Sequence, residues 1–257
     1  MTAVSVDTSK NDLNANTGSG TTGALSVRNG DIPVGSTVFV VVSSVGVTGT
    51  DSITMADSKG NTYVESQSLS FANDEALYLF RGYITTKLVS GTDSWTSTHS
   101  ATSQTRTVGV LVCSNVENVD HPVDRTINFA SSGTGWTVSI ASIGYDGIMV
   151  GASSWWFNGT DPGAVADSNG GGGTYGLFGS AFSYLNTNSH RGALVLEYAL
   201  TNTGDTKNFA GTWSKTITGS SLQLMAAFSV TPPPGIAKID TSKFPKRYLR
   251  SKPSAIA

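Results

Sequence analysis

Apolar residues in this chain fall into short runs separated by turn-forming residues. No stretch of ten or more residues shows the 3.6-residue period of an amphipathic helix. Residues 38–43 form a continuous run rich in valine, which is typical of a strand covered on both faces. Other strand-like segments lie at 77–84, 94–98, 109–113, 136–140, 147–155, 193–199 and 222–230. This pattern predicts an all-β protein, an antiparallel β-sandwich or jelly roll with extended terminal arms.

Three regions follow from the same pattern. Residues 1–23 are rich in Gly, Asn and Thr and are interpreted as an N-terminal arm, flexible or lying at a sheet edge. Residues 24–231 form the β-sandwich domain, and residues 232–257 form a C-terminal tail led by three prolines. Within the domain, residues 158–189 contain few apolar residues and four consecutive glycines, so they are expected to form a long exposed loop. The strand rhythm of the two halves is too weakly alike to establish a repeat.

The amino-acid composition predicts a surface that carries few charged residues. Charged residues make up 13% of the 257 residues, about half of the roughly 25% that is usual for soluble domains. Gly, Ser and Thr fill the remainder, which disfavours helices and suits short strands joined by turns. A surface with few charges has little to desolvate when it meets a neighbour. The composition therefore favours a protein that is part of an assembly.

The net charge of the chain changes sign at the three prolines, residues 232–234. The tail from residue 235 carries six Lys or Arg and one Asp, a charge of about +5 (6 − 1). The body carries the other ten Lys or Arg and seventeen Asp or Glu, about −7 (10 − 17). A basic tail on an acidic body predicts docking to another acidic subunit, whereas the overall negative charge argues against nucleic acid as the partner. The tail residues expected to dock are Phe244, Lys246, Arg247, Tyr248, Leu249 and Arg250.

Compartment signals are few. Cys113 is the only cysteine, so no disulfide can form within the chain, and it is expected to be a buried thiol. The first sixteen residues lack the basic and apolar regions of a signal peptide. No apolar run approaches the ~18–20 residues of a membrane span. We therefore expect synthesis and folding in a cytoplasm, with no membrane partner.

Candidate catalytic groups are sparse, and no cofactor is implied. His99, His121 and His190 have no metal-ligand spacing, and Cys113 has no thiol partner, so no metal site is expected. A Ser-His-Asp triad remains open in a chain so rich in serine, although no G-x-S-x-G pattern supports one. Asp124, with Asp120 and His121, is interpreted as part of a polar turn. Glu197 is interpreted as facing solvent or paired with an arginine, and the prediction is that the protein is not an enzyme.

Aromatic residues offer one binding hypothesis. Trp155 and Trp156 are adjacent, so on a strand they face opposite sides. The outward ring, together with Tyr175 of the expected loop, could stack on a sugar. The alternative is that both tryptophans are buried beneath that loop. Trp155, Trp156 and Tyr175 are thus the candidate glycan-binding residues.

Several segments resemble, in order, a β-sandwich module of actinobacteriophage virion proteins. They are ITMADSKGNTYV at 53–64, LYLFRGYITTKL at 77–88, VGVLVCSNVENVDHPVD at 108–124, DGIMVGA at 146–152, ALVLEY at 193–198 and LQLMAAF at 222–228. Proteins of this kind are minor tail or head-surface components, and the resemblance carries no catalytic residues with it. It implies a virion structural protein that assembles through its arms with other virion proteins and with copies of itself, by analogy as a trimer. Host attachment is a further expectation. The alternatives are a module that binds host cell-wall glycan and, less favoured, a cell-wall hydrolase using Glu197 or Asp124.

Overall fold

The computed structural model describes residues 3–71, 75–116, 122, 124–140, 146–157, 165–167, 175–183, 191–202 and 207–230. It confirms the predicted all-β fold, an antiparallel β-sandwich built from two sheets. A short strand, β1 (Ser5–Val6), and a 3-10 turn, η1 (Thr8–Lys10), precede the sandwich. The expected docking tail and the residues proposed within it lie outside the described residues.

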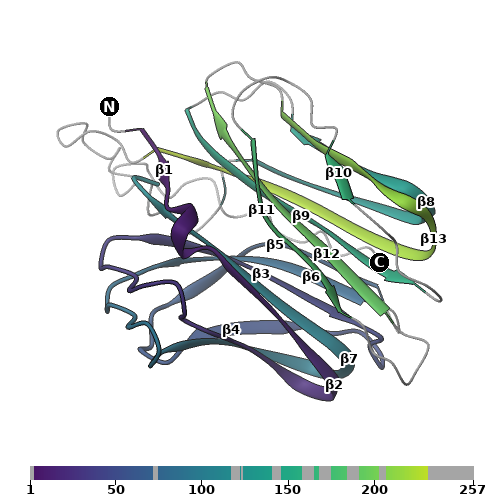
Figure 1. Ribbon diagram of the computed structural model, residues 1–257, viewed down its shortest axis with the longest axis horizontal. Helices are drawn as coiled ribbons and strands as arrows, with labels where there is room; N and C mark the ends of the chain where they lie inside the picture. Colours follow the sequence, from purple (N-terminus) through teal and green to yellow (C-terminus); the bar gives the residue numbers. More distant parts are fainter. Residues whose placement is uncertain are drawn as a thin grey trace, which may run out of the picture.

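The strands fall into two consecutive modules, one for each sheet (Figure 1). Module 1 consists of β2 (Asp12–Ser26), β3 (Thr37–Val45), β4 (Ile53–Asp57), β5 (Tyr63–Phe71), β6 (Glu75–Tyr83) and β7 (Ser94–Ser114). Module 2 consists of β8 (Asp124–Ile140), β9 (Gly147–Phe157), β10 (Val165–Asp167), β11 (Tyr175–Ser183), β12 (Arg191–Thr201) and β13 (Lys207–Ser229).

Both modules have the same topology. In module 1 the long strand β7 pairs with β2, β3 and β4, while β3 also pairs with β6, and β6 with β5. In module 2 the long strand β13 pairs with β8, β9 and β10, while β9 also pairs with β12, and β12 with β11. Each strand of module 1 therefore has a counterpart six strands later, a repeat that the sequence did not establish.

Each sheet bends, so that its outer part packs over its own central strands. The pairing of β2 with β7 shifts register near Gly20, and the pairing of β8 with β13 shifts between Thr212 and Ser221. Beyond the bend in module 1, the outer segment formed by β4 and the first half of β7 packs over β3 and β6. Ile53 and Trp95 from this outer segment share a buried cluster with Val40 of β3. Module 2 has an equivalent cluster, in which Val138 and Ile140 pack with Met149.

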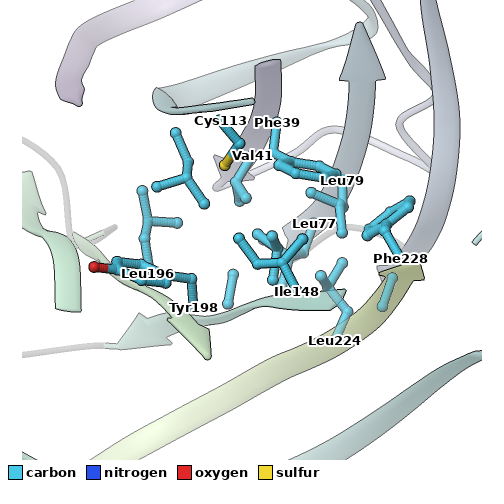
Figure 2. Close-up of a cluster of buried hydrophobic side chains, with 14 of the residues drawn as sticks. Phe39, Val41, Leu77, Leu79, Cys113, Ile148, Leu196, Tyr198, Leu224 and Phe228 are labelled. Atoms are coloured by element: carbon cyan, nitrogen blue, oxygen red, sulfur yellow. The ribbon is translucent and has the colours of Figure 1, made fainter. Parts of the chain in front are cut away.

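The central apolar cluster lies between the two modules. It combines Phe39, Val41, Leu77, Leu79, Leu111 and Cys113 of module 1 with Ile148, Val150, Leu194, Leu196, Leu224 and Phe228 of module 2, among others (Figure 2). The rings of Phe39 and Phe228 meet across it at a centroid distance of 4.6 Å. Alternate residues of β3 therefore face different clusters, which explains why the run at 38–43 is apolar throughout.

The structure makes one sequence interpretation more specific and changes another. Residues 12–23 of the predicted N-terminal arm belong to β2, which among the described strands pairs only with β7 and so lies at a sheet edge. Residues 158–189, expected to be one exposed loop, contain the strands β10 and β11. The alternating apolar pattern that marks strands is weak in both segments because Gly, Ser and Thr dominate them. The segments at 94–98 and 109–113 likewise join into the single strand β7 across a polar middle.

Substituting Gly109 tests the fit of the central cluster. A Cβ at this position would lie 2.1 Å from Leu196 Cδ1 and 3.0 Å from Leu13 Cδ1. Gly109→Val is expected to lower the free energy of unfolding by about 1–3 kcal/mol, because overpacking displaces these leucines. Urea denaturation measures the change. Thr98→Val, at an exposed position of the same strand, is the control and should stay within about 0.5 kcal/mol of the parent. Equal stability of the two variants would contradict the packing.

Candidate functional site

A buried chain of hydrogen bonds joins an aspartate, a histidine and a serine in module 1. Nδ1 of His99 lies 2.7 Å from Oδ2 of Asp51, and Oγ of Ser97 lies 3.0 Å from Nε2 of His99. The side chains of His99 and Asp51 have no exposed surface. This order of groups is that of the relay in serine hydrolases. It makes the trio the first set of described residues to weigh for catalysis.

Strand alternation brings the trio together. Ser97 and His99 are buried residues of β7, while Thr98 between them is exposed. Asp51 lies two residues before β4, and Ile53 of β4 pairs with His99. The trio therefore lies inside module 1, between the outer segment of the bent sheet and its central strands.

Asp51 receives several hydrogen bonds. The Ser44 hydroxyl donates to Oδ2 at 2.8 Å, and the Ala101 amide donates to Oδ1 at 3.2 Å. Burial alone would raise the pKa of Asp51, but the hydrogen bonds from His99, Ser44 and Ala101 together lower it below its ordinary value of 3.8. Asp51 is therefore a carboxylate at neutral pH and fixes the proton of His99 on Nδ1.

Ser97 can satisfy either protonation state of His99. When His99 is neutral, Nε2 accepts a hydrogen bond from the Ser97 hydroxyl. When His99 is protonated, Nε2 donates to Ser97, whose hydroxyl can then donate to the Gly23 carbonyl 3.3 Å away. The network therefore leaves no ring nitrogen unpaired in either state.

The backbone of β2 closes the network. A Cβ at Gly23 would lie 2.7 Å from Oγ of Ser97, and Ser97 has no exposed surface. Arg106 holds this part of β2 by donating from Nε to the Thr22 carbonyl at 2.7 Å. A substrate cannot reach the serine while β2 is in place. The observed geometry is therefore that of a stabilising polar network, not of an open active site.

A second network closes the turn at 57–61, which connects β4 to β5. Oδ1 of Asp57 accepts from the amides of Lys59 and Asn61, and Oδ2 accepts from the Asn61 side chain and the Tyr63 hydroxyl. The Tyr63 hydroxyl in turn accepts from Nε1 of Trp95 at 2.8 Å. Both carboxylate oxygens are thus engaged by donors of the protein, and the turn acts as a cap over the core of module 1.

The candidate glycan-binding residues do not converge. Trp155 is fully buried and donates from Nε1 to Ser153 at 2.8 Å, so its ring is not the outward-facing one of the Trp155–Trp156 pair. Trp156 pairs with Gly192, and Tyr175 pairs with Ala199, seven positions further along β12 (199 − 192). At about 3.3 Å per residue, their backbones are separated by roughly 23 Å. This distance is too long for the two to form one platform for a sugar ring.

The remaining candidates are also dispersed. Glu197 is 2% exposed, so the solvent-facing interpretation of it is wrong. It shares a face of β12 with Ala199, and that face is covered by the cluster of module 2. Asp124 is the first residue of β8 and pairs with Ala227. Asp120, His121 and His190 lie outside the described residues, as do Phe244, Lys246, Arg247, Tyr248, Leu249 and Arg250.

Sequence reasoning missed the Asp51 network. It considered His99 only as a metal ligand, and it sought a serine through the G-x-S-x-G pattern. One signal was available: in a strand over 94–101, Ser97 and His99 share a face with Trp95. A histidine on the buried face of a strand requires a partner. The identity of that partner, 48 residues earlier, depends on how β4 pairs with β7.

Neither a metal centre nor a membrane-spanning helix occurs among the residues that the structure describes. That part of the chain holds no group of three or more His, Cys, Asp or Glu side chains placed to bind a metal ion. Within it, no helix has the length and apolarity needed to cross a membrane. Comparison of the chain with protein-family models, curated proteins and solved structures gives no match.

The pH dependence of unfolding tests the Asp51 network. Because the folded pKa of Asp51 is depressed, its contribution is present above the ordinary value of 3.8 and is lost as pH falls through the lower folded value. Asp51→Asn removes this titration. The free energy of unfolding of the parent should fall more steeply below pH 3.8, by up to about 1.4 kcal/mol per pH unit, than that of the variant. Urea melts from pH 6 to about pH 2 measure the slopes. Parallel slopes would contradict an ionised, bonded Asp51.

Proposed function

We propose that this protein is a structural component of a bacteriophage virion, a minor tail or capsid-surface protein that assembles through its terminal segments. The observation that carries the proposal is the gathering of chain ends at one end of a two-module sandwich. The side chain of Asn115 donates to the Ala3 carbonyl at 2.9 Å, and Val116 forms a β-bridge with Val230. The start of the chain and the point where the tail leaves are therefore close together.

Charge supports attachment at that end. The tail from residue 235 is about +5, whereas the body is about −7. A tail that leaves one end of a compact body can reach a neighbouring subunit while the body stays folded. Its cations would pair with acidic groups there, and Phe244, Tyr248 and Leu249 would supply apolar anchors. The virion setting itself rests on the resemblance of the strand segments to phage proteins.

The polar networks of module 1 favour this role over catalysis. Ser97, His99 and Asp51 have the order of a catalytic relay, but the serine lies beneath Gly23. Trp155 is buried, and Trp156 and Tyr175 are far apart, so the geometry gives no support to a glycan platform built from these three residues. The proposal therefore assigns the protein a scaffolding role and no reaction.

Deleting residues 235–257 tests attachment through the tail. The variant should remain folded and soluble, because the last strand of the described residues, β13, ends at Ser229, but it should no longer enter phage particles. Particles produced with the variant in place of the parent are purified and probed for the protein by mass spectrometry. A full-length control carrying Lys87→Ala, which removes one exposed cation of the body, should be incorporated normally. Normal incorporation of the truncated chain would contradict the proposal.

A second test addresses the catalytic alternative. A fluorophosphonate probe labels serines that are activated and accessible, and closure by Gly23 predicts that Ser97 stays unlabelled in the folded protein. Peptide mass spectrometry after labelling locates any adduct, with Ser97→Ala as the matched variant. An adduct on Ser97 of the native protein would replace the scaffolding role with a hydrolase.

A further inference from the structure

The central strands of the two modules can be matched residue by residue, which defines how the modules face each other. In β5 the pairing with β6 skips a residue between Glu65 and Gln67, opposite Phe80 and Leu79. In β11 the pairing with β12 skips a residue between Leu177 and Gly179, opposite Glu197 and Leu196. A bulge at the same place in the same strand pair makes Leu79 the equivalent of Leu196.

The strand ladders carry this equivalence across each sheet. Leu79 pairs with Val41, and Leu196 pairs with Ala152, so Ser43 is the equivalent of Ser154, two residues further along. The next ladder makes Gly109 the equivalent of Leu224 and Cys113 the equivalent of Phe228. Of these matched positions, Leu79 and Cys113 contribute to the central cluster from module 1, and Leu196 and Phe228 contribute to it from module 2 (Figure 2).

Contacts between equivalent residues show an approximate twofold axis. Oγ of Ser43 lies 2.7 Å from Oγ of Ser154, and this pair is buried. At the opposite end of β3 and β9, just beyond the ends of β7 and β13, Val116 bridges Val230. The position equivalent to Val116 is 231, one residue from Val230. A residue touches its own equivalent only near a twofold axis, the arrangement of an isologous interface.

Contacts away from the axis occur in matching pairs. The Arg81 guanidinium lies 6.0 Å from the centre of the Phe228 ring. The equivalents of these two residues are Tyr198 and Cys113, and burial followed by the neighbouring Cys113 thiol raises the pKa of Tyr198. The interface inside this chain is thus built like the interface of a homodimer.

We propose that the central face of module 1, formed by β3, β6 and the second half of β7, is a self-complementary docking surface that also accepts module 1 of a second copy of this chain. Module 2 is the occupant supplied by the same chain. The proposal does not depend on a virion role, since it concerns how two copies can be joined by exchange of modules.

Side-chain volumes are compatible with this pairing. Phe39 now contacts Phe228, and the equivalent contact matches Val150 with the smaller Cys113. Two copies of module 1 would instead place Phe39 opposite Cys113 twice, a large residue against a small one. Hydrophobic contacts that conserve the summed volume are tolerated best.

Two copies of module 2 would not fit in the same way. Leu196 now occupies the space above Gly109, where even a Cβ would lie 2.1 Å from its Cδ1. Module 2 has Leu224 at the position equivalent to Gly109. The chain therefore opposes leucine to glycine once (Leu196 and Gly109) and leucine to leucine once (Leu79 and Leu224), whereas module 2 paired with itself would oppose Leu196 and Leu224 twice. Module 1 would oppose Leu79 and Gly109, which leaves room. Self-pairing is therefore expected to favour module 1, which has space at Gly109 in both copies.

Cysteines on the axis test the proposal in the full chain. The 2.7 Å between Ser43 and Ser154 is close to a disulfide S–S bond of about 2.05 Å. With the natural linker, Ser43→Cys/Ser154→Cys should oxidise to a monomer with an internal disulfide, which checks the axis. Deleting residues 117–123 joins Val116 directly to Asp124. Their partners on β13, Val230 and Ala227, are three residues or about 10 Å apart, so the two modules of one chain can no longer pair as they do here. In that background Ser43→Cys alone should give a reducible covalent dimer of doubled mass, whereas Ser154→Cys alone should not.

The outcomes are distinct. Exchange of module 1 with module 2 of another chain would give a noncovalent dimer with no disulfide between the two introduced thiols, which would overturn the proposal while leaving the twofold axis intact. If the shortened chain fails to fold, as judged by circular dichroism, a protease site inserted between Glu117 and Asn118 serves instead. The folded Ser43→Cys chain is cleaved there, held in low urea to allow exchange and then oxidised. Absence of a crosslinked dimer of the first fragment would likewise overturn the proposal. None of these results depends on incorporation into phage particles.

Discussion

The apolar contact between the two central sheets is the constraint on which the rest of the structure depends. Phe39, Leu79 and Leu111 of one module meet Leu196, Leu224 and Phe228 of the other in a single buried cluster. Truncating one such leucine or phenylalanine to alanine removes about 2–5 kcal/mol in typical cores, a large fraction of the stability of a domain. Because the same strands also bury their opposite faces, they can carry few polar residues. The buried polar networks around Asp51 and Asp57 therefore lie where the sheet bends and at the turn after β4.

The polar networks follow from this arrangement. Asp51, His99 and Ser97 lie inside module 1, where the bent sheet covers itself, and each donor and acceptor on the histidine ring has a partner. Such a network is stabilising only if it is fully satisfied, since a buried polar group without a partner is costly. Gly23 completes the closure that keeps Ser97 from solvent. An arrangement that would be catalytic at a surface therefore serves as internal support here.

Much of the fold could be predicted from the sequence, because apolar runs such as 38–43 and 222–228 mark the central strands directly. The strand β2 and the part of β8 before residue 136 could not, since Gly, Ser and Thr are frequent there and weaken the alternation that marks a strand. The repeat was hidden for a related reason. Equivalent positions in the two modules are both buried but hold different residue types, such as Gly109 and Leu224 or Cys113 and Phe228. Only the strand pairing therefore shows that these positions match. The Asp51–His99 contact depends on that pairing too.

Native-state amide hydrogen exchange tests the central claim most directly, namely that the two modules are held as one unit by the layer between them. The amides of β3 and β6 in module 1 and those of β9 and β12 in module 2 should share the highest protection and should open together, with one free energy and one denaturant dependence. Outer residues of β4 should exchange at lower free energy. Separate opening of the two central sheets, each with its own free energy and denaturant slope, would contradict the account.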